Sequence, residues 1–106
     1  MRGDVGELLD LYGGMLTPKQ REYAEMYYFD DLSLSEIAEN VGITAPGVHD
    51  IITRATRKIR DAEDKTGLAA KIAALRGGVN EAIKLAEELP GAERLTALLN
   101  EVLDGV

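Results

Sequence analysis

The chain has 106 residues, a length typical of one domain, with a formal net charge of −7 and no cysteine. The lack of cysteine excludes disulfide and thiolate chemistry, and the acidic balance argues against indiscriminate binding to nucleic acid. Acidic residues near the N-terminus and the lack of a long apolar run exclude a signal peptide and a membrane-spanning helix. We therefore expect a cytoplasmic, all-α protein with no membrane partner.

Two helices are predicted before residue 30. The first covers residues 4–15 and ends at a glycine pair, and it carries apolar residues at helical spacing: Val5, Leu8, Leu9 and Tyr12. The second begins at a capping box formed by Thr17 and Gln20 and extends to about Phe29.

The five aromatic residues of the chain all lie within residues 12–29. The second helix places Tyr23, Met26, Tyr27 and Phe29 on one apolar side. We expect these side chains to pack in the core, because a platform for stacking nucleic-acid bases would need them exposed together.

A helix-turn-helix is predicted over residues 34–53. A capping box of Ser33 and Glu36 starts its first helix, and Thr44 caps its second helix. Gly42 lies at the sharp turn, where the backbone needs a residue that tolerates a positive φ. The core of the motif combines a small residue at the helix crossing, the turn glycine and flanking apolar residues: Ile37, Ala38, Gly42, Val48 and Ile51.

The second helix of the motif is predicted to extend from Ala45 to about Lys65, with Gly67 at its C-terminus. Its expected buried stripe consists of Val48, Ile51, Ile52, Ala55, Ile59 and Ala62. This interpretation assigns residues 1–66 to a helix-turn-helix domain and residues 67–106 to a helical tail.

The tail carries a short heptad pattern: Leu68, Ile72, Leu75, Val79, Ala82, Ala86 and Leu89. Gly77-Gly78 interrupts the helix-favouring composition but does not shift the heptad register. Two glycines inside a helix lower its stability by about 2 kcal/mol relative to alanine. Either the helix breaks there or its backbone lies close to a neighbour, and we expect a continuous helix. After Pro90-Gly91 a last helix would complete a hairpin that packs on the core or on a second copy, so a homodimer is a predicted partner.

The basic residues concentrate in one part of the acidic chain. Residues 44–60 carry a net charge of +3, from four bases and one acid, whereas residues 1–43 carry −6 and residues 61–106 carry −4. One interpretation is a solvated helix face, and the other is a phosphate-binding surface. The candidate nucleic-acid-binding residues are the polar and basic side chains of this helix: Thr44, His49, Thr53, Arg54, Arg57, Lys58 and Arg60.

The first turn of this helix is a poor reader of DNA bases, although helix-turn-helix proteins contact bases from these positions. Residues 45–47 are alanine, proline and glycine and have no side-chain donor, and Asp50 would repel phosphate. Arg54 and Arg57 lie further along, where they can meet the sugar-phosphate backbone. Weak DNA binding, phosphate-mediated binding of structured RNA and protein binding by the same face all stay open.

The sequence contains no pattern typical of a catalytic or metal site. His49 is the only histidine, there is no Cys/His set for zinc, and no glycine-rich loop follows a strand. We therefore predict a protein that is not an enzyme and that uses neither a cofactor nor a metal.

Several short motifs in the sequence resemble those of a known family: Leu16-Thr17 with Lys19-Gln20, Tyr27-Tyr28, Asp30-Asp31, and Ser33-Leu34 with Glu36-Ile37-Ala38-Glu39. Over roughly residues 5–65 the chain resembles the YlxM-like family of small bacterial helix-turn-helix proteins. It is also similar, more distantly, to region 4 of sigma factors. In that family the second helix of the helix-turn-helix begins Ser-Arg-Gln-Ala-Val-Tyr-Asp. Residues 44–50 here are TAPGVHD, so the arginine, glutamine and tyrosine are replaced.

The resemblance implies an all-helical fold, frequent dimerisation and a role near the signal recognition particle, which targets nascent membrane and secreted proteins. It also implies contact with the particle's GTPase or with its RNA. We therefore expect an accessory or regulatory protein of that pathway with nucleic-acid binding. The alternatives are a DNA-binding transcription regulator and a helical interaction module that binds no nucleic acid.

Overall fold

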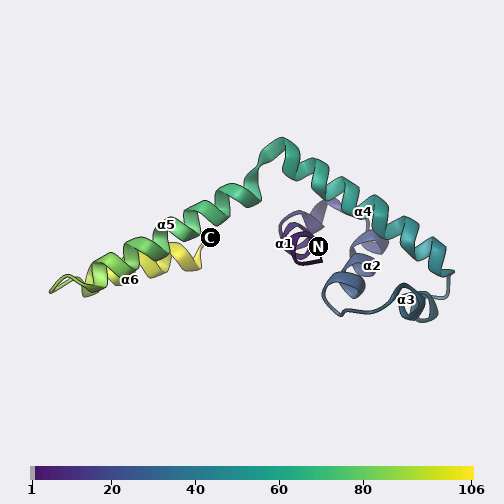
Figure 1. Cartoon of the computed structure of the whole chain (residues 1–106), viewed down its shortest axis with the longest axis horizontal. Coiled ribbons are helices and arrows are strands. Elements are labelled where there is room, and N and C mark those ends of the chain that lie inside the picture. The colour runs from purple at the N-terminus through teal and green to yellow at the C-terminus, as the bar shows by residue number, and fades with distance from the viewer. Residues whose placement is uncertain (1) are drawn as a thin grey trace. The chain divides into compact units, whose positions relative to one another are not determined.

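A computed structural model describes the backbone of residues 2–106 and the side chains of residues 5–106. These residues form six α-helices and one short 3-10 helix, with no strand among them, which confirms the all-α class (Figure 1). None of the described helices combines the length and the apolar character needed to cross a membrane. The chain divides into two compact units, Met1–Gly67 and Leu68–Val106, called here the N-terminal and C-terminal units.

The N-terminal unit is built around its longest helix. It contains, in chain order, α1 (Arg2–Tyr12), the 3-10 helix η1 (Gly13–Met15), α2 (Pro18–Tyr28), α3 (Leu34–Val41) and α4 (Ala45–Thr66). α4 packs against α1, α2 and α3 (Figure 1). Any surface that α4 presents is therefore held by three other helices.

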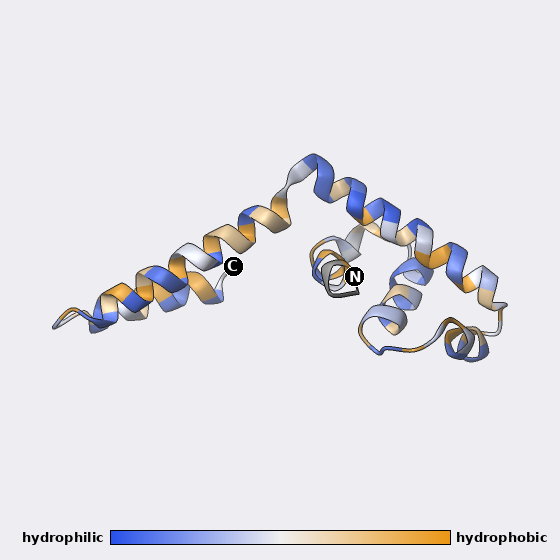
Figure 2. Ribbon diagram, viewed as in Figure 1, coloured by the Kyte–Doolittle hydropathy of each residue, from blue (hydrophilic) through white to orange (hydrophobic). Residues whose placement is uncertain are grey.

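The core of the helix-turn-helix brings together residues from α2, α3 and α4. Its buried members are Tyr23, Ile37, Ala38, Val48 and Ile52, and Ile51 packs against them while partly buried. The remaining predicted stripe of α4, at positions 55, 59 and 62, is also buried. Hydrophobic and hydrophilic residues alternate along α4, as expected for a helix with one buried face (Figure 2).

The aromatic residues divide between core and surface. Tyr12 and Tyr23 are buried, as expected, and the Tyr12 hydroxyl donates to Glu63 (2.8 Å) and bonds the Thr66 hydroxyl, which joins α1 to the end of α4. Core packing is wrong for Phe29, whose side chain is 45% exposed. Phe29 is the C-cap residue of α2, and its ring lies beside Gly6 of α1, where an added Cβ would be 3.3 Å from it.

The C-terminal unit is a hairpin of α5 (Leu68–Glu87) and α6 (Glu93–Asp104), with Gly91 in the turn at φ +75°. α5 is continuous through Gly77-Gly78, as expected. The predicted heptad seam is only partly right. Ile83 and Ala86 are buried in this hairpin, whereas three seam positions, Leu68, Leu75 and Leu89, are exposed. The other seam positions, 72, 79 and 82, are half-buried, so the covered face of α5 includes part of the predicted seam together with Ile83, which lies outside it.

The glycine pair in α5 predicts a gain of stability on substitution. A methyl group added at Gly77 or Gly78 would meet no other atom within 4 Å, so close backbone approach does not explain the pair. We expect Gly77→Ala and Gly78→Ala each to raise the free energy of unfolding by about 1 kcal/mol, measured by urea denaturation. Gly67→Ala is the control: Gly67 has a φ of +61°, so alanine there should lower stability. A loss of stability at Gly77 or Gly78 would contradict the prediction.

Candidate nucleic-acid interface

Local hydrogen bonds fix the two ends of α3. The Glu36 N–H donates to Ser33 Oγ (3.1 Å), and the Ser33 N–H donates to Glu36 Oε1 (3.0 Å). Gly42 takes a φ of +74°, and its N–H donates to the Ala38 carbonyl (2.9 Å). The chain can turn sharply at this point because glycine tolerates a positive φ without steric strain.

The capping box makes the stability of α3 depend on pH. Hydrogen bonds from the backbone N–H and side chain of Ser33 hold the pKa of Glu36 below its ordinary value. A pKa that is lower in the folded state stabilises the fold above the ordinary glutamate pKa, and this contribution is lost as the pH falls through the lower folded-state value. We expect Glu36→Gln to reduce this acid dependence in thermal unfolding followed from pH 7 to pH 3. An unchanged slope would contradict the role of the box.

The first turn of α4 offers little to a base edge. Thr44 Oγ1 accepts the Gly47 N–H (3.2 Å), so its hydroxyl oxygen already serves as the helix cap. Ala45, Pro46 and Gly47 follow, and a side chain added at Gly47 would lie 3.2 Å from Thr44 Oγ1. Before His49 the start of this helix therefore offers one side-chain donor, the Thr44 hydroxyl, whose oxygen is already engaged as the cap.

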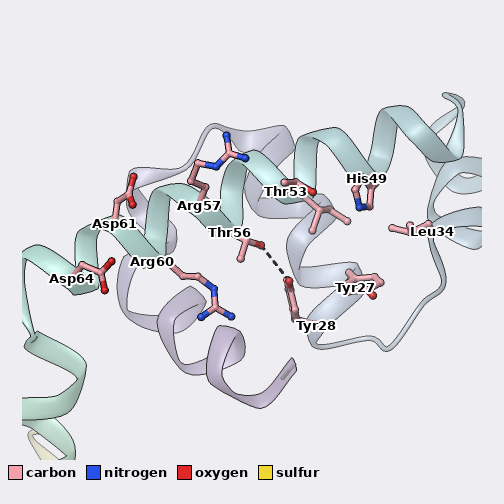
Figure 3. Close-up of a pocket in the computed structure, with 11 residues that line it drawn as sticks. Tyr27, Tyr28, Leu34, His49, Thr53, Thr56, Arg57, Arg60, Asp61 and Asp64 are labelled. Atoms are coloured by element: carbon pink, nitrogen blue, oxygen red, sulfur yellow. Dashed lines mark hydrogen bonds between the residues drawn. The ribbon is translucent and has the colours of Figure 1, made fainter.

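A groove lies further along α4, on the side that faces α2 and the start of α3. Its volume is about 530 Å³, within the range typical of ligand sites. Polar, aromatic and charged side chains line it: Tyr27, Tyr28, Leu34, His49, Ile52, Thr53, Thr56, Arg57, Arg60, Asp61 and Asp64. Figure 3 shows His49, Leu34 and Tyr27 toward one end of the groove and Arg60 and Asp64 toward the other.

The structure gathers four of the seven candidate residues at this groove: His49, Thr53, Arg57 and Arg60. The other three, Thr44, Arg54 and Lys58, do not line it. Arg54 instead forms an exposed ion pair with Asp50 one turn earlier (3.3 Å). In the view of Figure 3 the Arg60 side chain extends over α1, beside Tyr28, whereas Arg57 extends from the opposite side of α4.

Two tyrosines of α2, which pack against the core as expected, also form a wall of the groove. Tyr27 and Tyr28 are half-buried, and their rings meet edge to face at a centroid distance of 5.0 Å and an angle of 89°. The Tyr28 and Thr56 hydroxyls lie 3.2 Å apart in a hydrogen bond that joins α2 to α4 (Figure 3). In the sequence, the concentration of aromatic residues within residues 12–29 was the one signal that could have predicted an aromatic wall.

The charges of the groove are mixed. Among the described residues, neither Arg57 nor Arg60 has an ion-pair partner, so both guanidinium groups can meet an anion. Asp61 and Asp64 line the same groove, and they limit how much phosphate it can attract. Within the described part of the chain, no cluster of three or more His, Cys, Asp or Glu side chains could hold a metal ion.

A buried crossing of α3 and α4 around a turn glycine defines the class of helix-turn-helix proteins. Comparison of the sequence with protein families gives the particular family. The chain belongs to UPF0122, described as "Putative helix-turn-helix protein, YlxM / p13 like", whose model matches residues 2–98.

Individual members of the family are similar over most of the chain or over its first part. A UPF0122 protein of Desulforamulus reducens is 37% identical over 106 aligned residues, which cover 94% of this chain and 91% of that protein. One from Halalkalibacterium halodurans is 35% identical over 95 residues, covering 90% and 87%. One from Caldanaerobacter subterraneus is 48% identical over 64 residues, covering 60% and 55%.

Proposed function

We propose that this protein is a non-enzymatic accessory protein that binds structured RNA through α4, and that it acts beside the signal recognition particle. The observation that carries the proposal is the combination of cationic side chains on α4 with a first turn that lacks donors. Such a helix can hold phosphates but has little means to read a base sequence in a DNA groove. The place in the targeting pathway rests on the family resemblance.

The charge distribution supports a contact limited to α4. Residues 44–60 carry a net charge of +3 within a chain whose net charge is −7. The rest of the chain is acidic, with −6 over residues 1–43 and −4 over residues 61–106, so it would repel a long duplex. A compact folded RNA can engage a small cationic surface and avoid more of that repulsion.

The test is fluorescence anisotropy of labelled signal recognition particle RNA and of a random DNA duplex of equal length, over a salt series. We expect a preference for the RNA that persists near physiological salt. Equal weak binding that vanishes with salt would mean that only the charge of α4 is felt. In that case the RNA role fails, and the particle's GTPase becomes the first protein partner to test.

The helix-turn-helix itself favours a second candidate, a transcription regulator that binds DNA. Selection of binding sites from random duplexes separates the two candidates. Enrichment of one sequence motif would favour the regulator. Failure to enrich any motif would remove it, as expected from the residues at positions 45–47.

We also propose that the C-terminal unit mediates homodimerisation. It has fewer than about 40 residues, a size at which an isolated domain usually needs a partner or a covalent staple. Large apolar side chains are exposed on both of its helices and in the turn between them: Leu68, Leu75, Leu85, Leu89, Leu95, Leu98 and Val102. Light scattering should report a dimer for the wild-type chain and a monomer for Leu98→Glu, and a monomeric wild-type chain would contradict this proposal.

A further inference from the structure

We propose that the groove between α2 and α4 binds an unpaired nucleotide, with the base against Tyr27 and a neighbouring phosphate at Arg60. This inference rests on the proposed function, and it names the part of a nucleic acid that the surface would recognise. The site lies away from the first turn of α4, from which a helix-turn-helix contacts the edges of paired bases.

The tyrosine side chains of the groove can pack against a nucleic-acid base that is not stacked on its neighbours. Tyr27 is half-buried and lines the groove, and its ring stands nearly perpendicular to that of Tyr28. Tyr28 is fixed by the hydrogen bond between its hydroxyl and that of Thr56. Tyr27 packs on the Tyr28 ring and against the core of the helix-turn-helix, so it loses little freedom when a base packs on it, and every base has an aromatic face to offer.

Arg60 can hold a phosphate next to that base, at the end of the groove that also carries Asp61 and Asp64. From His49 to Arg60 the helix rises by roughly 16 Å, which leaves room for a base and its flanking phosphate. Arg60 extends over α1, beside Tyr28 (Figure 3), and it has no ion-pair partner among the described residues. A planar guanidinium can hold a phosphate by two parallel hydrogen bonds.

The acids and the concave shape disfavour a regular duplex at the same place. Asp61 and Asp64 line the groove beside Arg57 and Arg60, so a second row of phosphates would meet negative charge. In a duplex the faces of the bases are covered by their neighbours, so Tyr27 could not reach one. Bulges, loops and ends of RNA expose such faces, and a single DNA strand does so as well.

The experiment compares an RNA stem with one unpaired adenosine bulge and the same stem fully paired, by competition anisotropy with the full chain at fixed salt. We expect the bulged RNA to bind about tenfold more tightly, the scale of one base stacked on an aromatic ring. A DNA stem with the same bulge forms the third arm: equal preference assigns the site to any unpaired nucleotide, and preference for RNA alone assigns it to RNA.

Two pairs of matched variants locate the site. Arg60→Gln and Arg54→Gln remove the same charge from the same helix, but only Arg60 lines the groove, since Arg54 pairs with Asp50. We expect Arg60→Gln to abolish the preference for the bulge and Arg54→Gln to retain it. Tyr27→Leu should also abolish the preference, and Tyr27→Phe, which keeps the ring, should retain it.

The outcomes separate this inference from the function on which it rests. If neither RNA binds the wild-type chain, RNA binding itself fails and the groove assignment fails with it. If both RNAs bind equally, or if Arg60→Gln and Arg54→Gln have equal effects, RNA binding stands and only the groove assignment is overturned. Circular dichroism of each variant shows that it is folded, and the arginine pair gives the result even if Tyr27→Leu does not fold.

Discussion

The Ile37→Ala variant should unfold at a much lower urea concentration than the wild-type chain. Ile37 lies in the core of the helix-turn-helix, and its side chain is 0% exposed. Replacing a buried isoleucine by alanine costs about 2–5 kcal/mol, and a domain of this size has about 5–15 kcal/mol in total. The loss of helical signal during urea denaturation measures the change.

Ile43→Ala provides the matched control, because it removes the same atoms from the turn after α3. The Ile43 side chain is 40% exposed, so less apolar contact is lost and the decrease should stay below about 1 kcal/mol. Equal losses for the two variants would mean that the crossing of α3 and α4 is not the main source of stability in this unit.

The largest effect on binding is expected from reversing two charges on α4. Arg54→Glu with Arg57→Glu replaces two cations by anions on a surface proposed to contact phosphates. A hydrogen bond to a charged group contributes about 1.5–3 kcal/mol, so losing two such contacts should weaken RNA binding by about a hundredfold or more. Anisotropy at low salt, together with circular dichroism to show that the fold is intact, gives the measurement.

The control reverses two charges in the C-terminal unit, Lys84→Glu with Arg94→Glu. Both residues are exposed, and the net charge of the chain changes by the same amount. If the two double variants lose affinity equally, the effect comes from overall charge rather than from α4. If neither loses function in cells, a protein-interaction module without nucleic-acid binding becomes the better explanation.

The fold of the N-terminal unit could be predicted because its signals are local. Ser33 with Glu36, the glycine at position 42 and the cap at Thr44 each act within one helical turn, and the structure contains all of these interactions. The apolar spacing of α4 is also local, since every fourth or third residue faces the same side. Such signals can be read from a single sequence without knowledge of the tertiary contacts.

The groove could not be predicted, because it depends on how two distant segments meet. Tyr28 and Thr56 are 28 positions apart, and only the packing of α2 against α4 places their hydroxyls 3.2 Å from each other. An aromatic residue on an amphipathic helix normally reads as core, and Tyr23 fits that rule. Tyr27 and Tyr28 are only half-buried, a difference that the spacing along the sequence does not encode.

The seam of the C-terminal hairpin was predicted only in part for a related reason. Apolar residues lie on more than one side of α5, so the heptad spacing through Leu75 does not show that Ile83 is covered as well. The packing of α5 against α6 decides which side is covered. That choice requires the partner helix, whose rotation the sequence of α5 alone does not specify.

The first turn of α4 has no side-chain hydrogen-bond donor at positions 45–47, and this has a consequence for how the protein is distributed in a cell. A genome offers about 10⁶–10⁹ competing non-specific DNA sites. A protein occupies one specific site among them only if its side chains make contacts with that site's bases that the other sites cannot make. The side chains of alanine, proline and glycine at positions 45–47 can make almost no such contacts. A protein with this helix would be positioned by the shape and abundance of its ligand, so its occupancy should follow the concentration of that ligand and not the sequence of the genome.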